Sequence, residues 1–240
     1  MHENEMNHKI VNTLEPITLV GGGVAQVNDV KQALLLSKQC VVADGGLGLV
    51  LAAGATPAAV IGDFDSVNTA ELGQVRQNLL HKITEQDSTD FEKALNHIQS
   101  PAILAVGFTG GRLDHQMAVL NALVTHCDQM IVVIGETELV MHVPKDIVLP
   151  TESGDVVSLF PMAPTSGASE GLKWPIAGLE FDPSGKIGTS NQALGPVHLR
   201  MNAPGMLAVI PRARFDTLVQ AVLAVPPEAR WSAPQSPVRA

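Results

Sequence analysis

Two aspartates separated by one residue follow a short apolar run, and their spacing suits metal chemistry. The run is Ala59–Ile61, Gly62 comes next, and Asp63 and Asp65 follow with Phe64 between them. Residues two positions apart in an extended segment point to the same face, so both carboxylates can reach one divalent cation. Asp and Gly are also common turn residues, and a simple turn is the alternative explanation for this pair taken alone.

Other aspartates also follow predicted strands. Asp44 comes directly after one apolar run, and Asp87 and Asp90 follow another. Asp114 stands in the first turn of a predicted helix. Carboxylates at helix starts are often ordinary capping groups, which is the alternative explanation for Asp90. Six carboxylates gathered at one place would repel one another unless a cation or a base neutralised them. The set therefore predicts a divalent cation, most naturally Mg²⁺, that joins an acidic site to a phosphate-bearing small molecule.

Basic and glycine residues accompany these acids. Arg112 follows Gly110 and Gly111 at the opening of a predicted helix. Its planar guanidinium suits a bidentate grip on phosphate, and an ion pair with a neighbouring aspartate is the alternative. We expect His115 to play a supporting part. The segment GGGV (Gly21–Val24) could cradle a phosphate through backbone N–H groups, although it matches neither common glycine-rich phosphate motif.

The first 140 residues, which must position these side chains, repeat one pattern. An apolar run is followed by a Gly/Asp-rich break and then by a helix-like stretch. The runs are Ile17–Val20, Cys40–Ala43, Ala59–Ile61, His81–Thr84, Ala102–Val106 and Met130–Ile134. Strands that alternate with helices predict a mostly parallel, Rossmann-like sheet flanked by helices. Ligands of such sheets bind at the carboxyl edge, where aspartates distant in sequence would meet.

Two helices are predicted to start at this edge. The segment TDFEKALNHI offers Thr89 as N-cap and Glu92 three residues later, which together make a capping box. The segment GGRLDHQMAVLNALV has the apolar spacing of an amphipathic helix. The residues with that spacing are Leu113, Met117, Leu120 and Val124.

From about Met141 the pattern changes to short strand-like segments separated by Gly, Pro and Asp. Only FDTLVQAVLAV near the end has a helical period. This favours an α/β domain at 1–140, an all-β sandwich at 141–226 and a Pro-rich tail at 227–240. In the second half, Thr189–Gln192 could contact a polar heterocycle and Trp174 could offer a stacking face. Turn chemistry and a core tryptophan are the more common explanations for these two features.

Composition narrows the classes of partner. The chain of 240 residues has 45% hydrophobic and 16% charged residues, which is typical of a folded globular protein. With 15 basic against 24 acidic residues and no Lys/Arg cluster, a nucleic-acid partner is not expected. Cys40 and Cys127 make neither a disulfide framework nor a metal-ligand pattern. We find no signal-peptide pattern and no apolar stretch of about 20 residues, so we expect a soluble, cytoplasmic protein with no membrane contact.

The motifs ADGG, GDFDS, DSTDFEKAL and GGRLDHQMAVLNAL, in this order, closely resemble those of the thiamine pyrophosphokinase (thiamine diphosphokinase) family. The likeness continues through GLKWPI and TSNQ and covers about Ile17 to Ile210. The resemblance implies a homodimer of two-domain subunits, with the active site where the subunits meet. It also implies Mg²⁺-dependent transfer of a diphosphoryl group from ATP to the hydroxyl of thiamine, with release of AMP.

The resemblance assigns roles to residues of the matching motifs. Those implied for catalysis are Asp63, Asp65, Asp90 and Arg112, of which the three aspartates would hold Mg²⁺ or the charge network around the phosphates. Those implied for the nucleotide are Asp44, Gly45, Asp87, Thr89, Gly111, Arg112, Asp114 and His115. Those implied for thiamine are Ser190, Asn191 and, more loosely, Trp174.

Two other functions remain open from the sequence. An apolar run followed by Asp-x-Asp is also the nucleophile motif of haloacid dehalogenase-type phosphohydrolases, in which Asp63 would form a phosphoaspartate. That motif usually continues to a Thr where this chain has Val67. The second alternative is a non-catalytic nucleotide or thiamine sensor that kept the fold.

Overall fold

The computed structural model describes residues 9–65 and 67–234, which fold as two compact units. Unit 1 runs through Ala122 and includes Val133–Glu136, whereas unit 2 comprises Leu123–Val132 and the chain from Thr137 onward. Compact units of this kind do not define functional domains, so the limits 1–140, 141–226 and 227–240 stay predictions. Ser66 of the GDFDS motif and residues 235–240 of the predicted tail lie outside the described residues.

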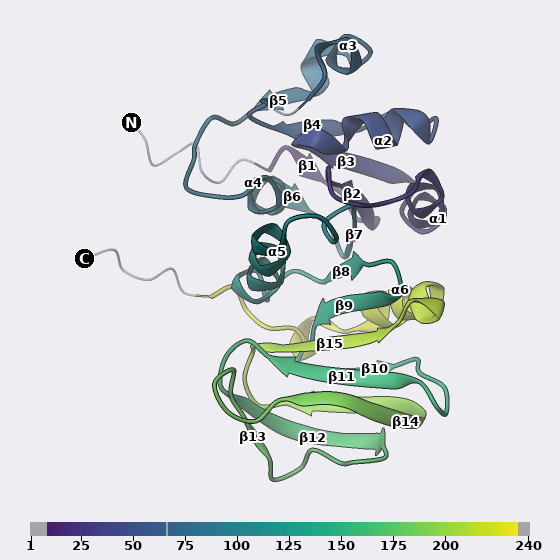
Figure 1. Ribbon diagram of the computed structural model, residues 1–240, viewed down its shortest axis with the longest axis vertical. Helices are drawn as coiled ribbons and strands as arrows, with labels where there is room; N and C mark the ends of the chain where they lie inside the picture. The colour runs from purple at the N-terminus through teal and green to yellow at the C-terminus, as the bar shows by residue number, and fades with distance from the viewer. Residues whose placement is uncertain (1–8, 66, 235–240) are drawn as a thin grey trace, which may run out of the picture. The chain divides into compact units, whose positions relative to one another are not determined.

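The central feature of unit 1 is a parallel sheet in the order β7-β2-β3-β4-β5 (Figure 1). The strands of unit 1 are β1 (Val11–Asn12), β2 (Ile17–Val20), β3 (Gln39–Ala43), β4 (Ala59–Gly62), β5 (Leu80–Lys82), β6 (Ile98–Gln99) and β7 (Ile103–Val106). The next strand, β8 (Ile131–Ile134), has residues in both units. Each predicted apolar run overlaps one of these strands. β2, β3, β4 and β7 are almost wholly buried, as expected of parallel strands covered on both faces.

Helices alternate with these strands along the chain. They are α1 (Val27–Ser37), α2 (Leu47–Ala52), α3 (Thr69–Leu72), α4 (Asp90–His97) and α5 (Leu113–Thr125), with short 3-10 turns η1 (Asp44–Gly46) and η2 (Gln77–Leu79). α1 packs against β2 and β7, and α4 packs against β3 and β4. The predicted capping box of α4 is confirmed: the Thr89 hydroxyl accepts the N–H of Glu92 at 3.3 Å, and the Thr89 N–H donates to Glu92 Oε2 at 3.0 Å.

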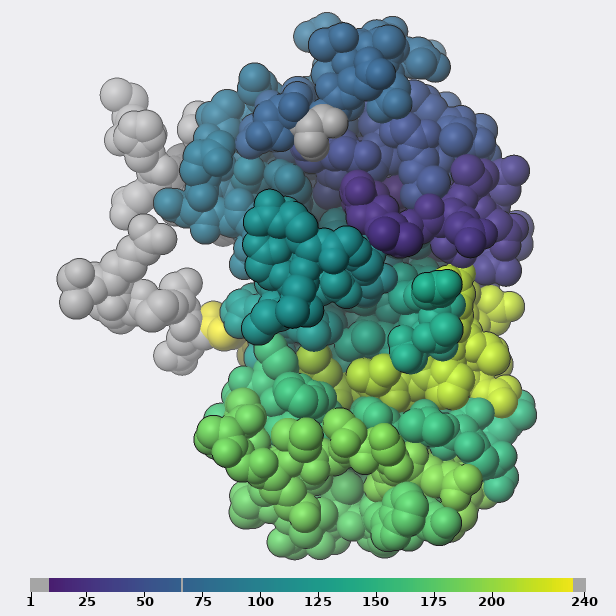
Figure 2. All heavy atoms as spheres, in the orientation of Figure 1, coloured from purple at the N-terminus to yellow at the C-terminus, as the bar shows by residue number. Residues whose placement is uncertain are grey.

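The apolar spacing of α5 does not mark its buried side. Leu113 is 70% exposed and Met117 is 61% exposed, whereas Val119 and Ala122 are buried. Figure 2 shows this teal segment at the surface. Apolar residues occur on more than one side of α5, so spacing alone could not indicate which side packs against the protein.

Unit 2 is built from antiparallel strands. They are β9 (Glu138–His142), β10 (Asp146–Leu149), β11 (Val156–Pro161), β12 (Thr165–Leu172), β13 (Glu180–Phe181), β14 (Gly188–Met201) and β15 (Met206–Pro211). Their order is β13-β12-β14-β11-β15-β9, with β10 on β14. The first residues of β14 pair with β11, and its later residues pair with β10 and β12. The long strand β14 therefore organises this unit.

Alternating burial fits this architecture, because one face of each antiparallel strand packs inward. Ile147 and Leu149 of β10 and Val157 and Leu159 of β11 are buried between more exposed neighbours. The mixed α/β class, with parallel strands followed by antiparallel strands, is confirmed.

Helical segments close the described chain. They are η3 (Arg212–Arg214), α6 (Phe215–Ala224) and η4 (Pro227–Ala229), and α6 packs on β10. One residue of the predicted tail is held against the protein: Trp231 Nε1 donates to the carbonyl of Val143 at 2.9 Å. Among the helices of residues 9–65 and 67–234, none combines the length and apolar character needed to cross a membrane.

Candidate active site

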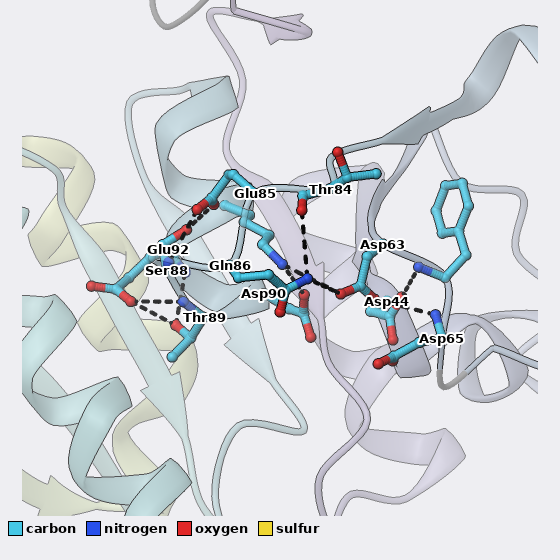
Figure 3. A network of polar contacts seen from close by, with 12 residues as sticks. Asp44, Asp63, Asp65, Thr84, Glu85, Gln86, Ser88, Thr89, Asp90 and Glu92 are labelled. Carbon is cyan, nitrogen blue, oxygen red and sulfur yellow. Dashed lines mark hydrogen bonds and ion pairs between the residues drawn. The ribbon is translucent and has the colours of Figure 1, made fainter.

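Three aspartates form an acidic cluster in unit 1. Each of Asp44, Asp63 and Asp65 offers one carboxylate oxygen, and these oxygens lie within 4.8 Å of one another (Figure 3). Asp44 directly follows β3, and Asp63 and Asp65 follow β4, its parallel neighbour. The parallel pairing therefore brings together side chains that are about 20 positions apart in sequence, as predicted from the ends of the strands.

The backbone after β4 is folded around the Asp44 carboxylate. The N–H of Phe64 donates to Asp44 Oδ1 at 2.8 Å, and Phe64 has a φ of 66°, in the left-handed region. A Cβ on Gly62 would lie 2.7 Å from Asp44 Oδ1, so only glycine fits there without a shift. The N–H of Asp65 donates to Asp63 Oδ1 at 3.2 Å, which is an Asx turn. The simple turn considered above as the alternative explanation is thus present, and it brings the carboxylates of the cluster together.

Electrostatics within the cluster favour an added positive charge. The Asp65 N–H holds the pKa of Asp63 below its usual value, with further hydrogen bonding from Gln86. The charge of Asp63 raises the pKa of Asp65, and the charge of Asp44 adds to this effect. Asp44 is only 2% exposed. Hard carboxylate oxygens at this spacing are the ligands that Mg²⁺ and Ca²⁺ prefer.

Asp90 lies beside this cluster and is paired with a lysine that the sequence reasoning missed. The Lys93 ammonium lies 3.3 Å from Asp90 Oδ1 and 3.7 Å from Asp63 Oδ2, and the Lys93 side chain is 4% exposed. Burial raises the pKa of Asp90, with a further contribution from Asp44, while Lys93 opposes both. The only signal in the sequence was the i, i+3 spacing of these two residues in the first turn of α4.

The loop before α4 makes its own hydrogen bonds. Glu85 Oε2 accepts the N–H groups of Asp87 and Ser88 at 2.8 and 3.2 Å, and Gln86 Nε2 donates to Asp63 Oδ2 at 3.3 Å. The Thr89 hydroxyl also donates to Glu92 at 2.9 Å, so this hydroxyl is already used in capping α4. Asp87 is exposed and contributes its backbone, not its carboxylate, to these bonds.

Glycines at neighbouring strand ends allow the backbones to approach closely. A Cβ on Gly46 would lie 2.3 Å from the carbonyl oxygen of Val20, and one on Gly23 would lie 2.6 Å from that of Gly107. Gly22 in turn lies against Gly45, where a Cβ would be 3.2 Å away. The ends of β2, β3 and β7 are therefore packed backbone to backbone. Phosphate binding by these loops stays a prediction.

Arg112 and Asp114 form an exposed ion pair at the start of α5. Arg112 Nε lies 3.1 Å from Asp114 Oδ1, and Nη2 lies 2.5 Å from Oδ2. The hydrogen bonds to Asp114 raise the pKa of Arg112, and the same contact lowers the pKa of Asp114. The N–H of His115 also donates to Asp114 at 3.0 Å. Gly110 and Gly111 precede the pair with φ values of 76° and 74°.

Two of the three predicted thiamine residues of unit 2, Asn191 and Trp174, are connected by hydrogen bonds. Asn191 Oδ1 accepts the N–H of Trp174 at 3.2 Å, and Asn191 Nδ2 donates to the carbonyl of Trp174 at 2.7 Å. Trp174 is 55% exposed, so it is not a core residue, and the Lys173 ammonium lies 4.8 Å from its ring centre. Ser190 is exposed with a φ of 60°, and its N–H donates to the Ser158 hydroxyl at 2.9 Å.

Comparison with known proteins places these features in one family. A family model described as "Thiamin pyrophosphokinase, catalytic domain" matches residues 30–134, and one described as "Thiamin pyrophosphokinase, vitamin B1 binding domain" matches residues 140–204. The chain belongs to the thiamine pyrophosphokinase family. The first match contains the acidic cluster, and the second contains Trp174, Ser190 and Asn191.

Individual relatives agree with this assignment. Thiamine pyrophosphokinase 2 of Arabidopsis thaliana is 29% identical over 154 residues, which are 56% of this chain and 58% of the relative. The chain thus aligns with less than two thirds of the curated relative's length. The structure of thiamin pyrophosphokinase from Geobacillus thermodenitrificans is 25% identical with a TM-score of 0.69, covering 82% of this chain and 96% of that one. The yeast enzyme has a TM-score of 0.69 at 18% identity, over 93% and 92% of the two chains, and shows the shared fold.

Proposed function

We propose that this protein is a thiamine diphosphokinase, which transfers the diphosphoryl group of ATP to the hydroxyl of thiamine and releases AMP. The observation that carries the proposal is the convergence of Asp44, Asp63 and Asp65 inside the stretch that the catalytic family model matches. These matches favour this function over a haloacid dehalogenase-type phosphohydrolase and over a sensor.

The donor set fits a magnesium ion. Asp44, Asp63 and Asp65 would hold it through carboxylate oxygens, and Asp90, already paired with Lys93, would belong to the charge network around the phosphates. When bound, Mg²⁺ neutralises phosphate charge and polarises the group under attack. Asp87, Thr89, Gly45 and Gly111 stay proposed nucleotide contacts.

The proposed chemistry is an in-line displacement. The thiamine hydroxyl oxygen bonds to the β-phosphorus of ATP, the bond from that phosphorus to the oxygen bridging the α-phosphate breaks, and AMP leaves with that electron pair. The hydroxyl proton passes to a carboxylate or to water. Arg112 would exchange Asp114 for phosphate oxygens, since its guanidinium is 72% exposed and its planar fork fits them. Positioning and charge stabilisation supply most of the acceleration in such reactions.

The remaining parts of the proposal concern assembly and location. The domain at 141–226 would be a β-sandwich that holds thiamine through Ser190, Asn191 and Trp174, and 1–140 would bind the nucleotide with help from His115. The active enzyme would be a homodimer with its site at the subunit interface. Exposed Leu113 and Met117 on α5 are side chains of the kind that subunit contacts cover. A cytoplasmic location is supported by two free, buried cysteines.

Incubation of the protein with ATP, Mg²⁺ and thiamine tests the proposal. We expect AMP and thiamine diphosphate in equal amounts, separated by chromatography, and no product when thiamine is omitted. Release of inorganic phosphate without thiamine would instead indicate a phosphohydrolase. Tight binding of ATP or thiamine with no AMP formed would indicate a sensor.

A further inference from the structure

The buried ammonium of Lys93 has no assigned part in the chemistry above, although it is in contact with the acidic cluster. Its Nζ lies 3.7 Å from Asp63 Oδ2 and 3.3 Å from Asp90 Oδ1. The side chain is 4% exposed, which is rare for lysine unless carboxylates compensate the charge. The ammonium therefore acts on the cluster with little screening by water.

Holding Asp63 in place does not require this lysine. Asp63 Oδ2 also accepts a hydrogen bond from Gln86 at 3.3 Å, and Asp63 Oδ1 accepts the N–H of Asp65 at 3.2 Å. Two hydrogen bonds thus fix both oxygens of Asp63 without Lys93. What Lys93 adds at Asp63 is a positive charge, which also acts through space on Asp65 and Glu85.

We propose that the charge of Lys93 lowers the net negative charge of the cation site. The site then binds a bare divalent ion only weakly and can accept the ion together with a triphosphate. The inference rests on the proposed function. With Lys93 present, the four carboxylates Asp44, Asp63, Asp65 and Asp90 carry one compensating charge before any cation binds. Without it, the site would bind a bare cation more tightly and repel the triphosphate more strongly.

The expected size of the effect follows from Coulomb's law. A unit charge and a divalent ion about 6 Å apart repel enough, even in water-like surroundings, to change a binding constant about tenfold. Removal of the Lys93 charge should therefore tighten binding of a bare divalent ion about tenfold. A lysine that served only to hold the site together would have the opposite effect, because its loss would loosen the ligands and weaken the ion's binding.

The experiment measures Mn²⁺ binding to the full chain without nucleotide, from the electron paramagnetic resonance signal of the free ion and its displacement by Mg²⁺. Lys93→Met and Lys93→Gln, which remove the charge, should each bind Mn²⁺ about tenfold more tightly than the wild type. Lys93→Arg keeps the charge and should stay within about threefold. Lys31→Met, on the exposed side of α1, is the matched control and should not differ from the wild type.

Kinetics complete the test. In the neutral variants the KM for MgATP should rise about tenfold although the bare ion binds better, and Lys93→Arg should restore it. Unchanged or weaker Mn²⁺ binding in a neutral variant with a cooperative thermal transition would overturn the inference. If one neutral variant does not fold, the other carries the comparison. A wild-type protein that makes no AMP would contradict the proposed function, whereas an active wild type with unaltered Lys93 variants would contradict only the part assigned to Lys93.

Discussion

The side chain of Asn191 is hydrogen-bonded to both backbone polar groups of Trp174, at 3.2 Å to its N–H and 2.7 Å to its carbonyl. The same Oδ1 accepts the N–H of Gln192 at 2.8 Å. The carboxamide of Asn191 is therefore largely engaged by the protein, while the indole of Trp174 is exposed. If Trp174 contacts thiamine as proposed, this relationship predicts that Asn191 acts on the ligand through the tryptophan.

A double-mutant cycle tests this indirect action. Trp174→Ala and Asn191→Ala should each raise the KM for thiamine about tenfold, the size expected from loss of one aromatic contact with a heterocycle. The double variant should be little worse than either single variant, because both changes remove the same ring position. The KM for ATP is the internal control and should change by less than about twofold. Additive effects on the thiamine KM would mean that Asn191 contacts the substrate directly.

Neutralising the cluster should remove activity and preserve the fold. In Asp63→Asn and Asp65→Asn we expect kcat to fall at least about a hundredfold, since each change removes a charged oxygen that is proposed as a metal ligand and leaves a similar shape. Asp65 is exposed and repelled by Asp63, so its loss should not destabilise the protein. Circular dichroism and thermal melting check the fold. Asp216→Asn, an exposed residue of α6, makes the same charge change and should keep normal turnover. Near-normal rates in both cluster variants would contradict the metal assignment.

Arg112 should matter for catalysis and little for stability. Its ion pair with Asp114 is exposed on both sides, and such pairs contribute little to stability because water screens them. Arg112→Ala should therefore leave the midpoint of unfolding in urea nearly unchanged. If its guanidinium binds phosphate during turnover, kcat/KM for ATP should fall by about ten- to a hundredfold. Arg76→Ala removes another exposed arginine and serves as the control. Unaltered kcat/KM in Arg112→Ala would leave the ion pair as this residue's only role.

Much of unit 1 was predictable because buried parallel strands appear in a sequence as short apolar runs. The runs ending at Ala43 and Ile61 placed Asp44, Asp63 and Asp65 at neighbouring strand ends, and the cluster formed there. The start of α4 was equally clear, since Thr89 and Glu92 act within one turn and need no tertiary contact.

The rest depended on tertiary packing that local pattern does not encode. A lysine in a helix is ordinarily solvated, so nothing nearby in the sequence indicated that Lys93 would be buried against Asp63, which is 30 positions earlier. The link from Asn191 to Trp174 joins different segments of unit 2 in the same way. For Arg112 both phosphate binding and an ion pair fitted the sequence, and only coordinates could show the contact with Asp114.

Burial of His142 should make stability depend on pH. The side chain is 6% exposed, its Nε2 accepts the N–H of Gly205 at 2.8 Å, and burial lowers its pKa from 6.5 to about 4. The folded pKa lies below the unfolded value, so the unfolded chain binds the proton first. The stabilising contribution is thus complete above about pH 6.5 and is lost as the pH falls toward 4, at up to about 1.4 kcal/mol per pH unit.

His142→Gln isolates this contribution, because a glutamine oxygen can accept the Gly205 N–H and does not titrate. Urea unfolding at pH 7, 6 and 5 should show the wild type losing more stability than the variant, the gap in free energy narrowing as the pH falls. Both proteins contain the other titrating groups, such as Asp63 and Asp155, so the contributions of those groups to the pH dependence cancel in the comparison. Parallel pH profiles would mean that His142 takes up its proton equally well in the folded protein, and the burial argument for this residue would fail.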